Sequence, residues 1–378
     1  MTRNTAQSRW HRRPAAFNRF WQRLSDGLEA QQLWNQFRAE ARSSYEFYSQ
    51  DVDWDDLKKK RGIRWGFRMA SAWFWAIVMK LSPSRRVALV LALLLASLGD
   101  VQFNVRTAHL DLDFRSLGFL LLLVLLGLEL SDRVTMKRDL QIARDIQRWL
   151  APAAPPQVPG IDISFMTTPA NTVSGDYYDA FLLDEDKKRL LLIVADVAGK
   201  GVPAAILMAS LQTCLHSCAS DSREPLPLVA RLNDFACTRS LEGQRFTTAF
   251  LAELDVETRE LQYVNAGHEF PVLRRANGSI ERLETGGLPL GVTRQATHEC
   301  GTTRLEPGDL LFVFSDGLVD APNAAGAPFG DERVVATVRE LGGESAEGAI
   351  RSMIERVDRF SGETRRDDDI TCLTLRVV

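Results

Sequence analysis

The sequence is poor in the residues that build the commonest metal and redox sites. Its 378 residues include five cysteines and five histidines, and the cysteines are scattered and odd in number. Such a set excludes a disulfide-bonded scaffold and shows no paired zinc ligands, so reduced thiols in a cytosolic compartment are expected. The one close grouping, Cys214-x-His216-x-Cys218, lies in an apolar helical run and is interpreted as ordinary packing residues.

Several other signals are missing as well. The first 30 residues contain arginines but no apolar core of a cleavable signal peptide. There is no nucleophile elbow, no internal repeat and no low-complexity tract. No segment resembles a PAS, GAF or HAMP sensory region, so the sequence does not indicate an input signal.

Charge is distributed unevenly along the chain. Residues 1–86 contain 17 Lys and Arg against 8 Asp and Glu, a net charge of +9 that leaves −12 for the rest, since the overall charge is −3. Within a basic head at 1–68, large apolar side chains recur on one helical face: Phe17, Phe20, Trp21, Leu24 and Leu28. This stripe fits a helix on an anionic membrane or one docked on protein. A nucleic-acid role is poorly supported, because the arginines are mixed with acids and apolar residues.

No apolar run reaches the roughly 20 residues that cross a bilayer, but two come close. They cover 87–104 and 115–131, and basic residues flank both outer ends. The positive-inside rule then places both ends in the cytoplasm. We therefore predict a membrane region at 69–131 with a helical hairpin in the inner membrane and the catalytic part in the cytoplasm. A buried helical pair is the alternative.

From 132 to 150 the pattern becomes charged and helical, with Met136, Leu140, Ala143 and Ile146 along one face. This linker helix is compatible with a homodimer, although fewer than about three heptads are too few to establish a coiled coil. A proline cluster at 151–156 ends the helix and marks a domain boundary.

Beyond the prolines, at 157–378, the sequence becomes rich in β-strand patterns. Strands are predicted at 161–166, 177–183, 190–197, 247–254, 261–264, 310–314 and 370–377. Two helices are expected between Pro203 and Ser240, and two more between Asp331 and Phe360. Strands in blocks with paired helices predict an α+β fold.

Four short segments in this part place an aspartate where a strand meets a loop. They are 174–179, 195–201, 314–317 and 367–371. Mg²⁺ and Mn²⁺ prefer oxygen ligands, and four carboxylates around two such ions can clamp a phosphoryl group and activate a water. A single Asp-Gly turn is common. The run of aspartates at 367–369, however, repels itself unless a cation is present.

These segments also carry a family resemblance. The matching motifs are Ile142-Ala143-Arg144-Asp145-Ile146-Gln147, Ser174-Gly175-Asp176-Tyr177-Tyr178-Asp179, Asp196-Val197-x-Gly199-Lys200-Gly201-Val202-Pro203, Phe246-Thr247-Thr248-Ala249, Asn265-Ala266-Gly267-His268, Leu288-Pro289-Leu290-Gly291, Pro307-Gly308-Asp309, Ser315-Asp316-Gly317-Leu318 and Asp368-Asp369-Ile370-Thr371. In this order they resemble the SpoIIE/RsbU-type serine phosphatases, the bacterial branch of the metal-dependent protein phosphatase 2C superfamily. The resemblance implies a PP2C-like α-β-β-α sandwich after the membrane hairpin and linker helix.

The resemblance also implies roles for individual residues. Two Mn²⁺ or Mg²⁺ ions would be bound by the following groups: Asp176, Asp196, the Val197 carbonyl, Asp316 and Asp368. Asp176 and Asp196 would be central to catalysis. Lys200, His268 and Asp369 would contact phosphate or support the ligands. His268 is interpreted as fixing the turn at 265–267 rather than as a general acid. Ser174 stands where the family commonly has glycine, which leaves the neighbouring carboxylate in place.

The implied function is hydrolysis of a phosphoserine or phosphothreonine in a regulatory protein, such as a phosphorylated anti-sigma-factor antagonist. A module that retains metals and binds phosphoproteins with little turnover is the alternative. A nucleotide cyclase is disfavoured. Ser174-Gly175-Asp176 is faintly similar to a cyclase motif, but Tyr177 occupies its second acidic position.

Overall fold

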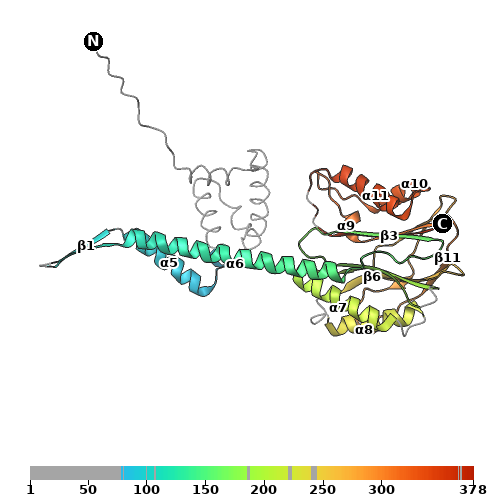
Figure 1. Ribbon diagram of the computed structural model, residues 1–378, viewed down its shortest axis with the longest axis horizontal. Coiled ribbons are helices and arrows are strands. Elements are labelled where there is room, and N and C mark those ends of the chain that lie inside the picture. The colour runs from blue at the N-terminus through green and yellow to red at the C-terminus, as the bar shows by residue number, and fades with distance from the viewer. Residues whose placement is uncertain are drawn as a thin grey trace, which may run out of the picture. The chain divides into compact units, whose positions relative to one another are not determined.

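The computed structural model describes residues 78–79, 81–98, 100–105, 108–184, 188–219, 224–239, 245–364, 366 and 368–378. The predicted basic head with its apolar stripe lies outside the described residues, and so does Asp367. The chain divides into two compact units, Met1–Asp132 and Arg133–Val378 (Figure 1).

The described part of the first unit is a helical hairpin with a β-ribbon at its turn. Helix α5 (Pro83–Leu98) leads into the antiparallel strands β1 (Asp100–Val105) and β2 (Ala108–Asp113), which precede helix α6 (Phe114–Leu150). A Cβ added to Gly118 of α6 would lie 2.5 Å from the backbone nitrogen of Ala96, so glycine is needed for this close helix packing.

Two expectations for this unit need correction. The helix expected at 87–104 ends at Leu98, because the chain turns into a strand, and the expected tight loop is a β-ribbon. The second apolar run and the expected linker helix at 132–150 are continuous in helix α6, which agrees with their order in the sequence.

The second unit is built around two sheets that are antiparallel except for the short parallel pairing of β10 with β7. One has the strand order β10-β7-β6-β5-β4, with β11 also paired to β7, and the other has the order β3-β13-β12-β8-β9. The first sheet contains β4 (Asp176–Leu182), β5 (Arg189–Val197), β6 (Thr247–Asp255), β7 (Glu260–Ala266), β10 (Gly286–Gly287) and β11 (Gly301–Arg304). The second contains β3 (Ile161–Thr168), β8 (Val272–Arg274), β9 (Ile280–Arg282), β12 (Leu310–Phe314) and β13 (Ile370–Val377).

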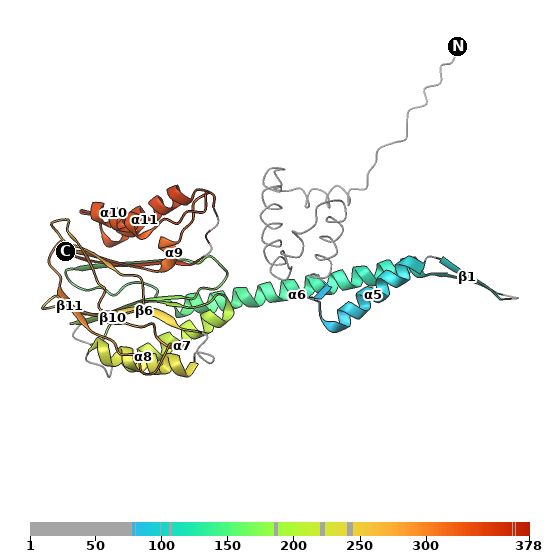
Figure 2. The ribbon, with the colours of Figure 1, turned by 180° about the vertical axis from the view of Figure 1, so that it is seen from behind.

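Helices cover the outer face of each sheet. Helices α7 (Val202–Ala219) and α8 (Pro225–Arg239) lie on one outer face, and α10 (Asp331–Glu340) and α11 (Ala346–Ser361) lie on the other (Figure 1; Figure 2). The short helix α9 (Asp316–Val319) follows β12 directly. This arrangement confirms the predicted PP2C-like α-β-β-α sandwich.

Strand β5 shows why the layers form. Leu190, Leu192 and Val194 face the second sheet, while Leu191 and Ile193 face α7, and all five side chains are at most 1% exposed. Because side chains alternate along a strand, an unbroken apolar run makes both faces of β5 apolar. Both faces must therefore be covered, which places β5 at the centre of the sandwich.

The predicted strands correspond to β3, β4, β5, β6, β7, β12 and β13, and the predicted helix pairs to α7 with α8 and α10 with α11. The short strands β8 to β11 were not predicted. With two to four residues each, they are too short to show a periodic pattern.

Candidate metal centre

The four predicted aspartates are positioned by strand ends. Asp176 begins β4 and Asp196 lies near the end of β5, and these two residues are directly opposed in the antiparallel pair. Asp316 follows β12, and Asp368 lies two residues before β13 of the same sheet. Each sheet therefore contributes two aspartates to a single site.

Burial and mutual repulsion dominate the electrostatics of this site. Burial, followed by the charges of Asp316 and Asp368, raises the pKa of Asp196 to about 6. Burial, followed by the charge of Asp196, holds the pKa of Asp176 well above its ordinary value. Burial and the charge of Asp368 also raise the pKa of Asp316. These carboxylates resist ionising together, and a nearby cation would relieve that cost.

The donor set fits hard divalent cations. Asp176 Oδ2 is buried and has no hydrogen-bond partner among the described residues, so it retains an acceptor for a ligand. As placed, no three of the described His, Cys, Asp and Glu side chains form a group that could hold an ion. One reason is visible at Asp368, whose Oδ2 lies 2.9 Å from Nζ of Lys200. Side chains must therefore move for a complete metal shell to form.

Asp369 has a structural role beside the predicted ligands. Its two carboxylate oxygens accept hydrogen bonds from the backbone N–H groups of Ala170, at 2.7 Å, and Gly175, at 3.0 Å. A Cβ added to Gly317 would lie 2.0 Å from the Asp369 carbonyl oxygen. The loop that carries Asp316 thus packs backbone to backbone against the loop that carries Asp368 and Asp369.

The loop after Asp196 is shaped by two glycines. Gly199 and Gly201 have φ angles of +104° and +77°. Residues with a Cβ rarely adopt such positive φ angles, so these positions favour glycine. Arg245, a residue that the sequence reasoning did not single out, donates from its guanidinium to the carbonyl oxygen of Ala198 at 3.2 Å. The Val197 carbonyl oxygen would lie 3.2 Å from a Cβ on Gly175, which places this predicted ligand at the start of β4.

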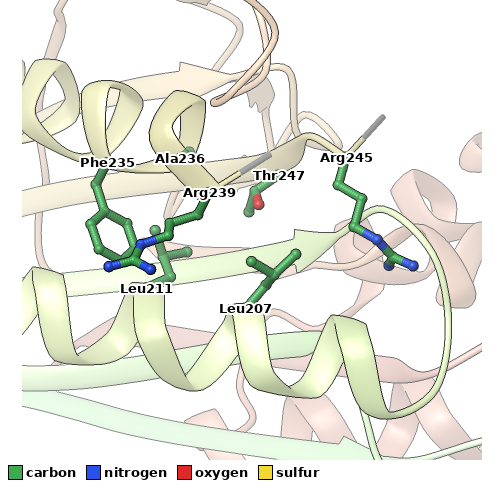
Figure 3. Close-up of a pocket in the computed structure, with 7 residues that line it drawn as sticks. All are labelled: Leu207, Leu211, Phe235, Ala236, Arg239, Arg245 and Thr247. Carbon is green, nitrogen blue, oxygen red and sulfur yellow. The ribbon is translucent and has the colours of Figure 1, made fainter. Parts of the chain in front are cut away.

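Figure 3 shows Arg245 among the residues that line a small cavity between α7, α8 and the start of β6. That cavity measures about 20 Å³, which is room for about one water. Leu207, Leu211 and Phe235 make its lining largely apolar. It is too small to be a substrate site.

His268 is placed as a turn-fixing residue. Its backbone N–H donates to Asn265 Oδ1 at 2.7 Å, and its Nδ1 lies 3.0 Å from the hydroxyl of Thr248, which pairs with Asp196 across the sheet. Burial lowers the pKa of His268 to about 4. A histidine that is neutral at pH 7 is a poor proton donor, so this geometry favours the turn-fixing interpretation.

The sequence reasoning also did not assign a role to Gln147. In the structure its side-chain amide donates to the Ser174 carbonyl oxygen at 2.8 Å, and its side-chain oxygen accepts from the Ser174 N–H at 3.0 Å. Ser174 Oγ in turn accepts from the Asp176 N–H at 3.0 Å. Gln147 lies in the first motif of the resemblance, which is the only signal that pointed to it.

Comparison with known proteins identifies the family. The family model described as Stage II sporulation protein E (SpoIIE) matches residues 186–378, half of the chain. The chain belongs to the SpoIIE family. The resemblance drawn from the motifs is thereby confirmed.

Among curated SpoIIE-like relatives, phosphoserine phosphatase RsbU of Bacillus subtilis is 30% identical over 217 residues, which cover 55% of this chain and 63% of RsbU. Protein IcfG of Synechocystis sp. is 28% identical over 272 residues, covering 65% of this chain and 42% of IcfG. The chain therefore spans less than two thirds of either relative. The solved SiaA-PP2C domain of Pseudomonas aeruginosa has a TM-score of 0.57 at 21% identity, covering 65% of this chain and 98% of that domain, which shows the PP2C fold.

Proposed function

We propose that this chain is a metal-dependent protein serine/threonine phosphatase acting on a phosphorylated regulatory protein. The observation that carries the proposal is that Asp176, Asp196, Asp316 and Asp368 come from two sheets to neighbouring strand ends, where burial and nearby carboxylate charges raise the pKa values of the first three. The phosphoserine phosphatase RsbU, similar over 55% of this chain, supports the same activity.

The residues of the site suit metal-dependent hydrolysis of a phosphate ester. The four aspartates and the Val197 carbonyl would hold two Mn²⁺ or Mg²⁺ ions. Such ions, when bound, lower the pKa of water and neutralise charge on a transferring phosphoryl group. Lys200 is bonded to Asp368 and 54% exposed, so it can exchange that carboxylate for a phosphate oxygen. Asp369 and His268 hold the surrounding loops by hydrogen bonds to backbone N–H groups and to Thr248.

The proposed substrate is a small phosphoprotein such as an anti-sigma-factor antagonist. The site supports a protein substrate because its aspartates lie at the ends of strands, with Asp196 partly exposed to solvent and Lys200 at the surface. The family resemblance supports the choice of partner.

We further propose that the first unit anchors the chain in the inner membrane, with the second unit in the cytoplasm. Two described helices, α6 and α7, are long and apolar enough to cross a membrane by length and composition. Helix α7 instead packs Leu211 and Leu215 into the core of the second unit. On α5 and the first part of α6, many large apolar side chains are exposed, including Val87 at 70% and Leu123 at 68%. Water rarely contacts so much contiguous apolar surface, and lipid would cover it.

We also propose that the chain forms a homodimer through helix α6. Ile142, Ile146 and Trp149 recur on one face at helical spacing and are 49%, 53% and 83% exposed. A second copy of the helix would cover this face. Cross-linking between cysteines introduced at position 146 tests the pairing, and its absence in intact membranes would contradict it.

The function is tested by measuring Mn²⁺-dependent phosphate release from a phosphoserine peptide by the full chain in detergent. Asp196→Asn removes a predicted ligand, and Asp234→Asn, on the exposed face of α8, is the matched control. We expect activity in the wild type and in the control, and a loss of at least about 100-fold in Asp196→Asn. Equal activity in both variants would refute the metal assignment. Metal binding without turnover in the wild type would favour the phosphoprotein-binding alternative.

A further inference from the structure

A candidate second site lies between the end of α6 and the core of the second unit and shares Asp176 with the proposed metal centre. A cavity of about 310 Å³ is lined there by residues from α6, β3, β4, the loop between these strands, and α7. This volume is within the range of small-molecule sites in proteins, about 300–1,000 Å³. It is far larger than the single-water cavity beneath α7 and α8.

Hydrogen bonds at two positions connect the end of α6 to the core beside the cavity. Gln147 of α6 is bonded twice to the backbone of Ser174, as described above. One turn further on, the carbonyl oxygen of Leu150 accepts a hydrogen bond of 2.7 Å from the side-chain amide of Gln212 on α7. These hydrogen bonds hold the last turn of α6 against the core, so the cavity is a formed feature of the unit.

The charged lining of the cavity is cationic on balance. Arg144 and Arg148 are spaced i, i+4 on α6 and both line it, against the single carboxylate of Asp176. Neither arginine has an ion-pair partner among the described residues. The Nε atom of Arg144 is buried and has no hydrogen-bond partner among the residues that the structure describes. A buried guanidinium nitrogen without a partner is costly unless a ligand supplies an acceptor.

The remaining lining is divided between hydroxyl and apolar groups. Thr167 and Thr172 offer hydroxyl groups, whereas Pro152, Pro169 and Met208 are apolar. A guanidinium group binds planar or tetrahedral oxyanions through paired N–H donors. The apolar side chains favour a ligand that also has a hydrophobic body.

We propose that this cavity binds a small amphiphilic anion, a phosphate, phosphonate or carboxylate group attached to an apolar body. The acidic head bonds to Arg144 and Arg148, and the body packs on Pro152, Pro169 and Met208. Because Ser174 and Asp176 also line the cavity, a bound ligand contacts both α6 and the start of β4. The cavity shares Asp176 with the proposed metal centre, but ligand binding there does not require phosphatase turnover.

The test is calorimetric titration of the full chain in detergent with phenylphosphonate, which a phosphatase cannot hydrolyse. Excess chelator keeps the metal centre from contributing to binding. Arg144→Gln/Arg148→Gln removes both charges, and Arg138→Gln, exposed elsewhere on α6, is the matched control. We expect the double variant to lose at least about tenfold in affinity and the control to match the wild type.

Three further measurements sharpen the result. Thr172→Phe fills the cavity while leaving both arginines in place, so it should also abolish binding. Inorganic phosphate should bind more weakly than phenylphosphonate, and neutral benzyl alcohol should not bind. Bound phenylphosphonate should slow hydrogen exchange at residues 170–176. Two results would overturn the proposal: no binding by the wild type up to about 10 mM, or unchanged binding in both the double variant and Thr172→Phe.

Discussion

Gly317→Ala should disable the metal centre without removing any ligand. The added Cβ would lie 2.0 Å from the carbonyl oxygen of Asp369, and real Cβ contacts essentially never fall below 3.0 Å. The obstacle is backbone, which cannot rotate away as a side chain would. The loop of Asp316 and the loop of Asp368 must therefore separate by about 1 Å.

A displacement of that size is large for a catalytic site. Misplacing reacting groups by about 1 Å can reduce a rate by about 100-fold. We therefore expect kcat/KM for a phosphoserine peptide to fall by about two orders of magnitude, together with weaker Mn²⁺ binding. Overpacking of this kind also costs about 1–3 kcal/mol of stability, less than the total stability of most domains.

The matched control is Gly343→Ala. Gly343 lies between α10 and α11, and a Cβ there would meet nothing within 4 Å. Both variants would be assayed as full chains in detergent, with Mn²⁺ titrated in each. Activity of Gly317→Ala within about threefold of the Gly343→Ala control would refute the argument that this backbone contact aligns the two loops.

Two further predictions concern positions around the site. Gln147→Ala loses both hydrogen bonds to Ser174, worth about 1–3 kcal/mol together, so hydrogen exchange at the Ser174 and Asp176 amides should accelerate while exchange in β6 stays unchanged. For His268, burial lowers the pKa to about 4 from 6.5, so the unfolded chain takes up the proton first as pH falls. The contribution of His268 to the stability of the second unit should be complete above about pH 6.5 and decline by about 3 kcal/mol towards pH 4. Denaturant midpoints measured across this pH range should decline less in His268→Asn than in the wild type. An equal decline in both would contradict the lowered pKa of His268 as its cause.

Much of the second unit was predictable because its signals are local. The apolar run at 190–197 predicted a strand, and the structure has β5 there, at the centre of the sandwich. The helix predicted over 87–104 failed at Leu98, because apolar composition alone does not distinguish the end of a helix from the start of a strand. The short strands β8 to β11 were missed for the related reason that pairing partners, not periodicity, define them.

By itself the sequence determined the strand and helix pattern of the second unit and the four aspartates at strand ends. Both depend on the pattern of residues close together in the chain. Only the tertiary structure decided which groups support those aspartates. Asp369 bonds the N–H of Gly175 across 194 positions of sequence, and Gln147 bonds Ser174 across 27. The cavity beside Arg144 and Arg148 likewise exists only where α6 meets β3, β4 and α7. Contacts at such separations depend on how the sheets and helices pack, and no local spacing in the chain encodes them.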